Sequence, residues 1–242
     1  METQDNVLEI KNLLKVFPGV RAVDDVSFDI KRNTVHCLVG ENGAGKSTLI
    51  KILTGVYQQT GGHVLLNGHE YNPQNPRDAK QQGISTLFQE LNVVDQLTVE
   101  ENLTLGMEDT WLGFLRRTDK INKMVDVMKS IEPSINPRQQ VSSLSVAQKQ
   151  IVEIAKAVAA ETDIIIMDEP TAAISESEIE RLFTIIRNLR EKDVTVIYIS
   201  HRLDEIFELG DYVTVLRDGC HITTSPVAQI EDRSELIRMM IG

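Results

Sequence analysis

The chain has 242 residues, of which 41% are hydrophobic and 25% charged, a balance typical of a globular protein with one large domain or two small lobes. Its formal net charge of −11 argues against a surface that grips nucleic acid or anionic lipid, because both need clustered Lys and Arg. Two cysteines are too few for a disulfide scaffold and fit a reducing cytosol, and no apolar run is long enough for a membrane-spanning helix.

The first part of the chain carries short strand signals separated by turns. Apolar residues recur at period two within residues 7–30, where Pro18-Gly19 marks a turn. A compact apolar run at 35–39 predicts a buried strand that leads into a glycine-rich loop at 40–45. Further on we expect a helix through 49–53 that ends at Gly55, and a strand at 64–66 with Asn67-Gly68 as its turn.

The stretch from about residue 91 to residue 141 has a different character. Strand signals are few, and Ile121, Met124, Val125 and Met128 recur at helical spacing. We therefore expect an inserted helical lobe here.

Apolar strands alternate with amphipathic helices in the rest of the chain. The expected elements are a helix at 146–160, a strand at 164–167, a helix at 176–190, a strand at 194–200, a strand at 212–216 and a helix at 234–241. Continuous apolar strands that alternate with helices predict a parallel sheet covered on both faces, and hence an α/β fold.

A phosphate-binding motif lies between the predicted strand at 35–39 and the helix after it. Gly40-Glu41-Asn42-Gly43-Ala44-Gly45-Lys46-Ser47 matches G-x-x-x-x-G-K-[ST]. The glycines let backbone N–H groups point at phosphate oxygens, and the helix N-terminus adds its positive end. Lys46 supplies a full positive charge, and the Ser47 hydroxyl can ligate Mg²⁺. The strand–loop–helix context disfavours the alternative, a glycine-rich turn with a solvated lysine.

Two acidic residues follow the apolar run Ile164–Met167. Asp168 and Glu169 are thereby expected at the carboxyl end of a buried strand, beside the phosphate loop of a doubly wound sheet. Asp168 can hold the shell of a Mg²⁺ ion, and Glu169 can orient or deprotonate an attacking water. The alternative is a pair of exposed loop charges after an ordinary strand, which the phosphate motif in the same chain disfavours.

A third motif makes the combination specific. Leu144-Ser145-Val146-Ala147-Gln148 resembles LSGGQ, the signature of the ATP-binding cassette (ABC) family, and the resemblance covers essentially the whole chain. Four segments resemble the first half of tandem monosaccharide-import ATPases of the ribose, galactose and xylose type: LSVAQ itself, the loop GENGAGKST, Phe88-Gln89-Glu90-Leu91 and Glu169-Pro170-Thr171-Ala172-Ala173.

The resemblance implies an architecture. It implies an α/β P-loop NTPase with a mainly parallel sheet flanked by helices, an antiparallel β subdomain and an inserted α-helical lobe. Residues 1–242 would form one ABC ATP-binding domain. Within it, 1–90 and 151–242 would form the β subdomain and the RecA-like core, and about 91–150 the helical lobe that bears the signature.

The resemblance also implies roles for individual residues. Those implied to bind nucleotide are Phe17, Gly40, Glu41, Asn42, Gly43, Ala44, Gly45, Lys46, Ser47, Thr48 and Gln89. The implied metal ligands are Ser47, Gln89 and Asp168. The implied catalytic residues are Lys46, Glu169 and His201. A nucleotide held by an opposing cassette would face the signature residues Leu144, Ser145, Val146, Ala147 and Gln148. Simpler alternatives stay open for a surface glutamine at 89, a structural histidine at 201 and a turn-packing phenylalanine at 17.

Several positions depart from the family pattern. Val146 and Ala147 replace the two usual glycines of the signature, which makes close backbone approach to phosphate harder. Ser175 stands where many members have Asp, and Asn33 stands where they have Gly, although Asn tolerates a left-handed turn. Two capping boxes are expected to open helices irrespective of the family: Ser145 with Gln148, and Ser175 with Glu178.

In functional terms, the resemblance implies an ATP-binding and ATP-hydrolysing subunit, with ATP and Mg²⁺, that energises monosaccharide import through a membrane permease. The implied direct partners are the permease and a second ATP-binding cassette, which lies on the same polypeptide or on a separate subunit. A periplasmic or lipid-anchored sugar-binding protein would be an indirect partner, and no nucleic acid is expected to bind. The implied location is peripheral, on the cytoplasmic face of the membrane. The alternatives are a non-transport ABC ATPase of DNA-repair or translation type, and a P-loop kinase, which would leave LSVAQ unexplained.

Two further expectations concern assembly. The chain closes at Met239–Gly242 with no room for a second cassette, so we expect a truncated first half or a subunit that needs a mate, monomeric and slow to hydrolyse ATP when alone. Trp111, Leu112, Phe114 and Leu115 form an apolar cluster in the expected helical lobe. Core packing is its simpler interpretation, and a groove for a permease helix is the functional one.

Overall fold

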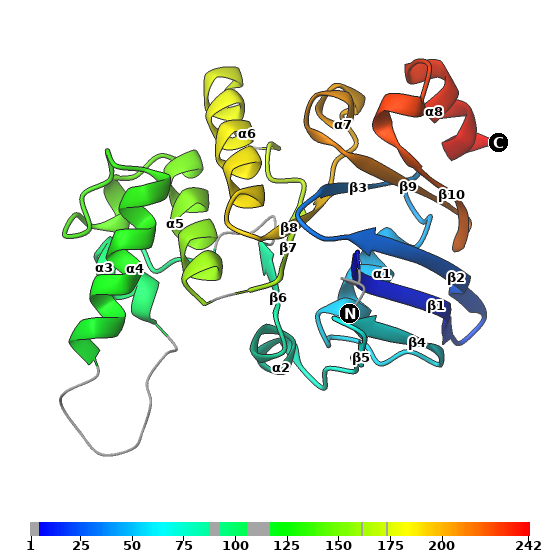
Figure 1. Cartoon of the computed structure of the whole chain (residues 1–242), viewed down its shortest axis with the longest axis horizontal. Coiled ribbons are helices and arrows are strands. Elements are labelled where there is room, and N and C mark those ends of the chain that lie inside the picture. The colour runs from blue at the N-terminus through cyan, green and yellow to red at the C-terminus, as the bar shows by residue number, and fades with distance from the viewer. Residues whose placement is uncertain (1–4, 88–91, 106–116, 161, 173) are drawn as a thin grey trace. The chain divides into compact units, whose positions relative to one another are not determined.

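The computed structural model describes residues 5–87, 92–105, 117–160, 162–172 and 174–242. The chain divides into two compact units. One unit, termed the sheet unit, comprises Met1–Thr86, Asp163–Glu169 and Ile186–Gly242. The other, termed the helical unit, comprises Leu87–Thr162 and Pro170–Ile185. Figure 1 labels the helices and strands of both.

A four-stranded antiparallel sheet forms one part of the sheet unit. Its strands run in the order β2 (Val20–Lys31), β1 (Asn6–Phe17), β4 (Gly61–Leu66) and β5 (His69–Glu70). β1 and β2 are longer than the short strands that the sequence pattern indicated. Asn12 and Asp25 adopt left-handed backbone conformations near the register shifts between the two strands, and this interrupts the period-two alternation of apolar residues.

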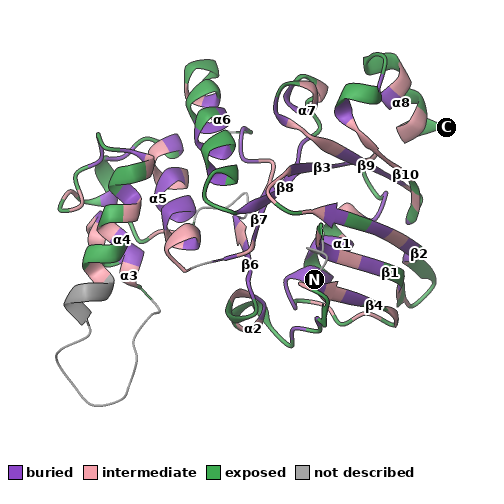
Figure 2. Cartoon of the chain, viewed as in Figure 1, coloured by how far each residue is buried: buried purple, intermediate pink, exposed green. Residues whose placement is uncertain are grey.

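A six-stranded sheet forms the other part of the sheet unit. Its order is β10 (Cys220–Pro226), β9 (Tyr212–Arg217), β3 (Val35–Val39), β8 (Thr195–Ile199), β7 (Ile164–Asp168) and β6 (Ile84–Leu87). β3 pairs parallel with β8 and β9, and β7 pairs parallel with β8, whereas β10 is antiparallel to β9. All five residues of β3 and of β8 are buried (Figure 2), which confirms the prediction of fully covered parallel strands.

The sheet unit contains α1 (Lys46–Leu53), α2 (Pro76–Gln81), α7 (Leu203–Leu209), α8 (Arg233–Ile241), the last part of α6 (Glu176–Arg190) and a short 3₁₀ turn at Val227–Gln229. The sequence predicted α1 and α8 but not α2 or α7. The side chain of Asn75 accepts a hydrogen bond from the Asp78 N–H at 3.0 Å, and Pro76 follows it, so α2 begins through local capping rather than an apolar stripe.

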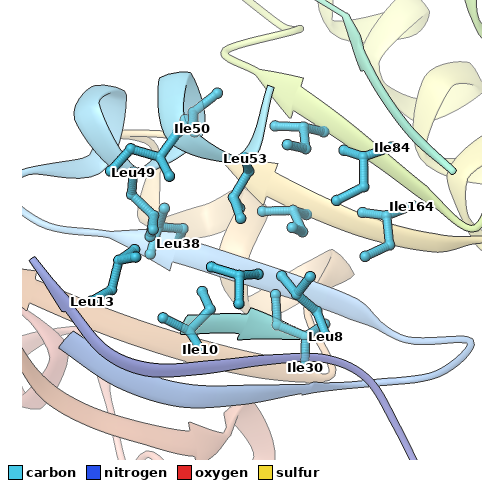
Figure 3. Close-up of a cluster of buried hydrophobic side chains, with 14 of the residues drawn as sticks. Leu8, Ile10, Leu13, Ile30, Leu38, Leu49, Ile50, Leu53, Ile84 and Ile164 are labelled. Carbon is cyan, nitrogen blue, oxygen red and sulfur yellow. The ribbon is translucent and has the colours of Figure 1, made fainter. Parts of the chain in front are cut away.

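One hydrophobic core joins the two sheets to α1. Figure 3 shows Leu8, Ile10 and Ile30 from the antiparallel sheet, Leu38, Ile84 and Ile164 from the six-stranded sheet, and Leu49, Ile50 and Leu53 from α1 in this cluster. Each of these side chains is at most 3% exposed, and burying one contributes about 1.5–3 kcal/mol. The core therefore fixes α1, and the loop before it, against the end of β3.

The helical unit contains α3 (Val99–Thr104), α4 (Arg117–Ile131), a 3₁₀ turn at Val141–Ser143, α5 (Val146–Ala159) and the first part of α6 (Glu176–Arg190). α4 carries the predicted helical spacing, and it buries Met124 and Met128. α6 has the predicted bounds, and α5 ends one residue earlier than expected. Each helix in the described part of the chain is too short or too polar to cross a bilayer.

Candidate functional site

The loop between β3 and α1 has a backbone that requires glycine. Gly40, Gly43 and Gly45 have φ values of 154°, 90° and 101°. A Cβ atom at Gly40 would lie 2.2 Å from the Leu216 carbonyl oxygen, and one at Gly45 would lie 2.6 Å from the Ala22 carbonyl oxygen. At Gly43 no atom lies within 4 Å of such a Cβ, so there the positive φ, not the space, favours glycine.

A turn of the six-stranded sheet supports this loop from the side. The turn Asp218-Gly219 joins β9 to β10, a strand that the sequence did not predict, and both of its residues have positive φ. The Gly219 N–H donates to the Ala44 carbonyl at 3.2 Å, and the Gly219 carbonyl accepts from the Asp24 N–H at 2.8 Å. The glycine-rich loop is therefore fixed by both sheets of the unit.

Lys46 is the first residue of α1 and folds back over the loop. Its Nζ donates to the Gly40 carbonyl at 2.6 Å and to the Glu41 carbonyl at 3.0 Å. Burial lowers the pKa of the Lys46 amine, while the negative charges of Glu169 and Asp168 oppose that shift. The sequence predicted a cation at this loop, and the structure brings it near both carboxylates.

Asp168 and Glu169 lie at the carboxyl end of β7. Burial raises the pKa of Asp168, the charge of Glu169 raises it further, and Lys46 lowers it. Glu169 has a left-handed backbone, with φ of 48°, and its N–H donates to the Ile199 carbonyl at 3.0 Å. This backbone conformation costs a non-glycine residue about 1–2 kcal/mol. The hydrogen bond to Ile199 at the end of β8 helps to hold it, and it sets the direction in which the Glu169 side chain leaves the backbone.

His201 follows β8 and meets Glu169. Its Nδ1 lies 3.2 Å from Oε1 of Glu169, and the His201 side chain is 70% exposed. Lys46, Asp168, Glu169 and His201 all belong to the sheet unit. The structure thus brings together a lysine, two carboxylates and an exposed histidine around the end of the glycine-rich loop.

The donor set suits a cation that takes few protein ligands. Among the described residues, no group of three or more His, Cys, Asp or Glu side chains is arranged to hold a metal ion. Asp168 is a partly buried carboxylate beside a second carboxylate, and a cation would relieve their repulsion. Mg²⁺ is commonly bound by one or two protein groups together with substrate phosphates. The residues present therefore fit Mg²⁺ that is bound along with a nucleotide.

An aromatic pair lies near the end of β1. The ring of Phe17 is partly buried and packs edge-on against Tyr57, with centroids 5.3 Å apart. Lys15 Nζ lies 5.0 Å from the Phe17 ring centre and donates to the Gln58 carbonyl at 2.7 Å. Phe17 was expected at this position, whereas Tyr57 and Lys15 were not, although an aromatic residue soon after the end of α1 at Leu53 was a visible signal. Phe17 packing and a binding role are both compatible with this geometry.

The signature-like motif lies at the start of α5 in the helical unit. Ser145 accepts a hydrogen bond from the Gln148 N–H at 3.3 Å, and Gln148 Oε1 accepts one from the Ser145 N–H at 3.0 Å, which confirms the capping box. Leu144 and Ala147 are buried, whereas Val146 is 39% exposed. The Ser145 hydroxyl also donates to Glu178 Oε1 at 2.9 Å, a contact that the sequence pattern did not predict.

Some predicted residues lie outside the described part of the chain. They are Gln89, with its neighbours Phe88, Glu90 and Leu91, Ala173, and the cluster Trp111, Leu112, Phe114 and Leu115. Their expected roles stay predictions.

A protein-family model described as "ABC transporter" matches residues 23–172, more than half of the chain. The chain therefore belongs to the ABC transporter family of ATP-binding cassettes. It is 45% identical over 242 residues to the ribose import ATP-binding protein RbsA 1 of Streptomyces avermitilis. This alignment covers 100% of the chain and 46% of the relative. It is 43% identical to the galactose/methyl galactoside import ATP-binding protein MglA of Fusobacterium nucleatum, over 100% of this chain and 48% of the relative.

A third relative, the putative ribose/galactose/methyl galactoside import ATP-binding protein of Geobacillus kaustophilus, is 46% identical over 99% of this chain and 48% of its own length. The chain thus spans about half the length of the curated relatives that it matches. The similarity to monosaccharide-import ATPases that the motifs indicated is confirmed.

Solved structures of ATP-binding cassettes share the fold. The ADP conformation of MJ1267, an ATP-binding cassette of an ABC transporter, has a TM-score of 0.86 and 26% identity over 98% of this chain and 99% of that one. A nucleotide-free ATP-binding cassette has a TM-score of 0.83 and 25% identity, over 98% and 96% of the two chains. These similarities, with the two sheets and the helices described above, confirm the predicted fold class.

Proposed function

We propose that the chain binds and hydrolyses ATP and that this activity energises the import of a monosaccharide through a membrane permease. The observation that carries the proposal is the glycine-rich loop with Lys46 folded over it and Asp168, Glu169 and His201 at its end. The names of its relatives, which are ribose and galactose import ATP-binding proteins, support the transport role. The relatives do not favour the non-transport alternative.

Residues 40–48 bind the nucleotide phosphates in this proposal. The left-handed glycines turn backbone N–H groups toward the phosphate oxygens, and the N-terminus of α1 adds its positive end. Lys46 exchanges its two carbonyl partners for the β- and γ-phosphates, which offer stronger, charge-assisted hydrogen bonds. Phe17 stacks against the adenine ring.

Mg²⁺ is held by Ser47, by Asp168 and by Gln89 in this proposal. When bound, it neutralises charge that develops on the phosphates. Glu169 accepts a proton from the attacking water. His201, whose Nδ1 lies within hydrogen-bond distance of Glu169, orients the Glu169 carboxylate and contacts the γ-phosphate. The left-handed backbone of Glu169 contributes by fixing where its carboxylate points.

The signature Leu144–Gln148 acts on a nucleotide held by an opposing cassette. Ser145 and the N-terminus of α5 then supply a hydroxyl and a positive helix end to that nucleotide. A solved dimer of a bacterial ABC transporter cassette, MJ0796, has a TM-score of 0.74 and 25% identity over 91% of this chain and 98% of that one, which supports pairing. The mate is a second cassette, on the same polypeptide or on a separate subunit.

The proposed domain organisation is one ABC ATP-binding domain, with a nucleotide-binding core and a helical lobe that bears the signature. The remaining proposed partners are an integral membrane permease and, indirectly, a sugar-binding protein. The chain then works as a peripheral component at the cytoplasmic face of the membrane.

Two experiments test the proposal. Phosphate release from MgATP should rise when the purified chain is supplied with its mate, because each catalytic site needs an opposing signature. Deleting the gene should reduce uptake of at least one labelled monosaccharide among ribose, galactose and xylose, and the Glu169→Gln form should not restore it. Unchanged uptake of all three sugars would contradict the transport role, whereas an absence of ATP hydrolysis would contradict the enzymatic one.

A further inference from the structure

The hydroxyl of Ser145 has its one proton already committed. Its oxygen accepts the Gln148 N–H at 3.3 Å, and it donates to Oε1 of Glu178 at 2.9 Å. A serine hydroxyl has a single proton to donate. While it is bonded to Glu178, Ser145 can offer a phosphate oxygen no hydrogen bond. This contact lies within the helical unit and joins the start of α5 to the start of α6.

The Glu178 carboxylate is itself firmly held. Its Oε2 accepts the Ser175 N–H at 3.0 Å and the Ser175 hydroxyl at 2.8 Å. Hydrogen bonds from the Ser175 backbone, the Ser175 side chain and the Ser145 side chain lower the pKa of Glu178, so the group is an anion at neutral pH. A fixed negative charge therefore lies at the N-terminus of α5, where the proposed function places the phosphate of an opposing nucleotide.

We propose that Glu178 is a built-in competitor of that phosphate: it holds the Ser145 hydroxyl in the unpaired cassette and must release it before two cassettes can close on ATP. This inference rests on the proposed pairing of signature and nucleotide. Glu178 acts through Ser145 and is a positioning residue. Its carboxylate weakens pairing in two ways, by keeping the hydroxyl proton and by repelling the incoming anion.

Replacing Glu178 with glutamine should remove both effects while retaining the local structure. The amide oxygen can accept both hydrogen bonds from Ser175, and the amide nitrogen then donates to Ser145, which leaves the hydroxyl proton free for phosphate. Glu176→Gln is the matched control. Glu176 is exposed in the same first turn of α6, so this change removes the same charge without altering the partner of Ser145.

The experiment measures pairing of the chain with MgATP by sedimentation equilibrium, in a Glu169→Gln background that retains ATP. We expect Glu178→Gln to tighten the dissociation constant of the pair about tenfold, and Glu176→Gln to leave it within about twofold of the parent chain. Ser145→Ala should weaken pairing. Thermal melting of each variant shows whether it is folded, and a structural role alone would lower the melting temperature without tightening pairing.

The outcomes separate the inference from the function on which it rests. If Ser145→Ala weakens pairing and Glu178→Gln matches Glu176→Gln, the competitor role is wrong and the proposed function stands. Weaker pairing of Glu178→Gln would also overturn the inference, because Glu178 would then assist Ser145 rather than occupy it. If Ser145→Ala pairs as well as the parent chain, the proposed signature contact is itself contradicted.

Discussion

A buried histidine makes the stability of the sheet unit sensitive to acid. His36 on β3 is 1% exposed, and its ring stacks against Phe28 and Tyr212. Nε2 is bonded to the Thr214 hydroxyl at 2.7 Å, whereas Nδ1 has no hydrogen-bond partner among the described residues. Burial, and then the charge of His221, lowers the pKa of His36 from 6.5 to about 3.

The sign of the effect follows from proton counting. Between about pH 3 and pH 6.5 the unfolded chain binds a proton at this position that the folded chain does not, so folding stability falls as pH decreases in that window. pH 5 lies about 1.5 units below the unfolded-state pKa of 6.5, so the folded state is about 2 kcal/mol less stable there than at neutral pH. The full pKa shift, reached at about pH 3 and below, corresponds to a loss of about 5 kcal/mol of folding stability. Above pH 6.5 His36 is neutral in both states and contributes no pH dependence.

The test is urea unfolding of the parent chain and of His36→Gln at pH 7 and at pH 5. Glutamine can still donate to Thr214 but does not titrate. Between pH 7 and pH 5 the His36→Gln variant should therefore lose about 2 kcal/mol less folding stability than the parent chain. Any constant cost of the substitution cancels in this difference. His69→Gln, at an exposed histidine on β5, is the control for a histidine-to-glutamine change. Equal pH dependence of the parent chain and His36→Gln would refute the reasoning.

Three further results are expected at the candidate site. Glu169→Gln should retain MgATP binding but lose most phosphate release, because an amide cannot accept the proton of the attacking water; turnover close to the parent rate contradicts its role as base. Gly45→Ala should lower the free energy of unfolding by about 2–3 kcal/mol or abolish nucleotide binding, since the new Cβ would lie 2.6 Å from a carbonyl oxygen. Gly43→Ala, which has open space, should cost only about 1 kcal/mol in the same urea titration, and equal losses for the two alanines would contradict the packing argument.

Elements with long apolar runs or clear helical spacing could be predicted from the sequence. The five buried residues of β3 and the amphipathic stripe of α6 carry their own signals, and both have the expected bounds. β8 is shorter than the predicted strand at 194–200 for a local reason. The Val194 N–H donates to the Leu189 carbonyl in a turn, so Val194 does not join the ladder, and Ile199 is the last residue of β8 that pairs with β3 and β7.

Short polar elements could not be predicted in the same way. α2 and α7 have six and seven residues, and β10 is largely exposed or half-buried, so none of them presents a periodic apolar face. α2 begins at the Asn75 cap, and β10 forms through antiparallel pairing with β9 rather than through an apolar pattern of its own. The left-handed turns at Asn33 and Asn67, by contrast, were visible because Asn and Gly favour that conformation.

The candidate site likewise combines a local motif, which the sequence reveals, with contacts between separate elements, which it does not. The glycine-rich loop is a local motif, so its residues could be identified from spacing alone. The bond between Ser145 and Glu178 joins residues 33 positions apart, and the left-handed backbone of Glu169 arises from pairing with Ile199. No local pattern encodes either contact, because each depends on how separate elements pack.

The central claim is that Lys46 and its loop bind ATP, and calorimetric titration of MgATP into the parent chain and Lys46→Ala tests it most directly. Lys46 supplies the full positive charge at the loop, so its removal should weaken ATP binding by at least about tenfold, or 1.4 kcal/mol. Lys11→Ala removes an amine that pairs with Glu9 on β1 and should bind ATP like the parent chain. Equal ATP affinity of the parent chain and Lys46→Ala, with both proteins folded, would contradict the account.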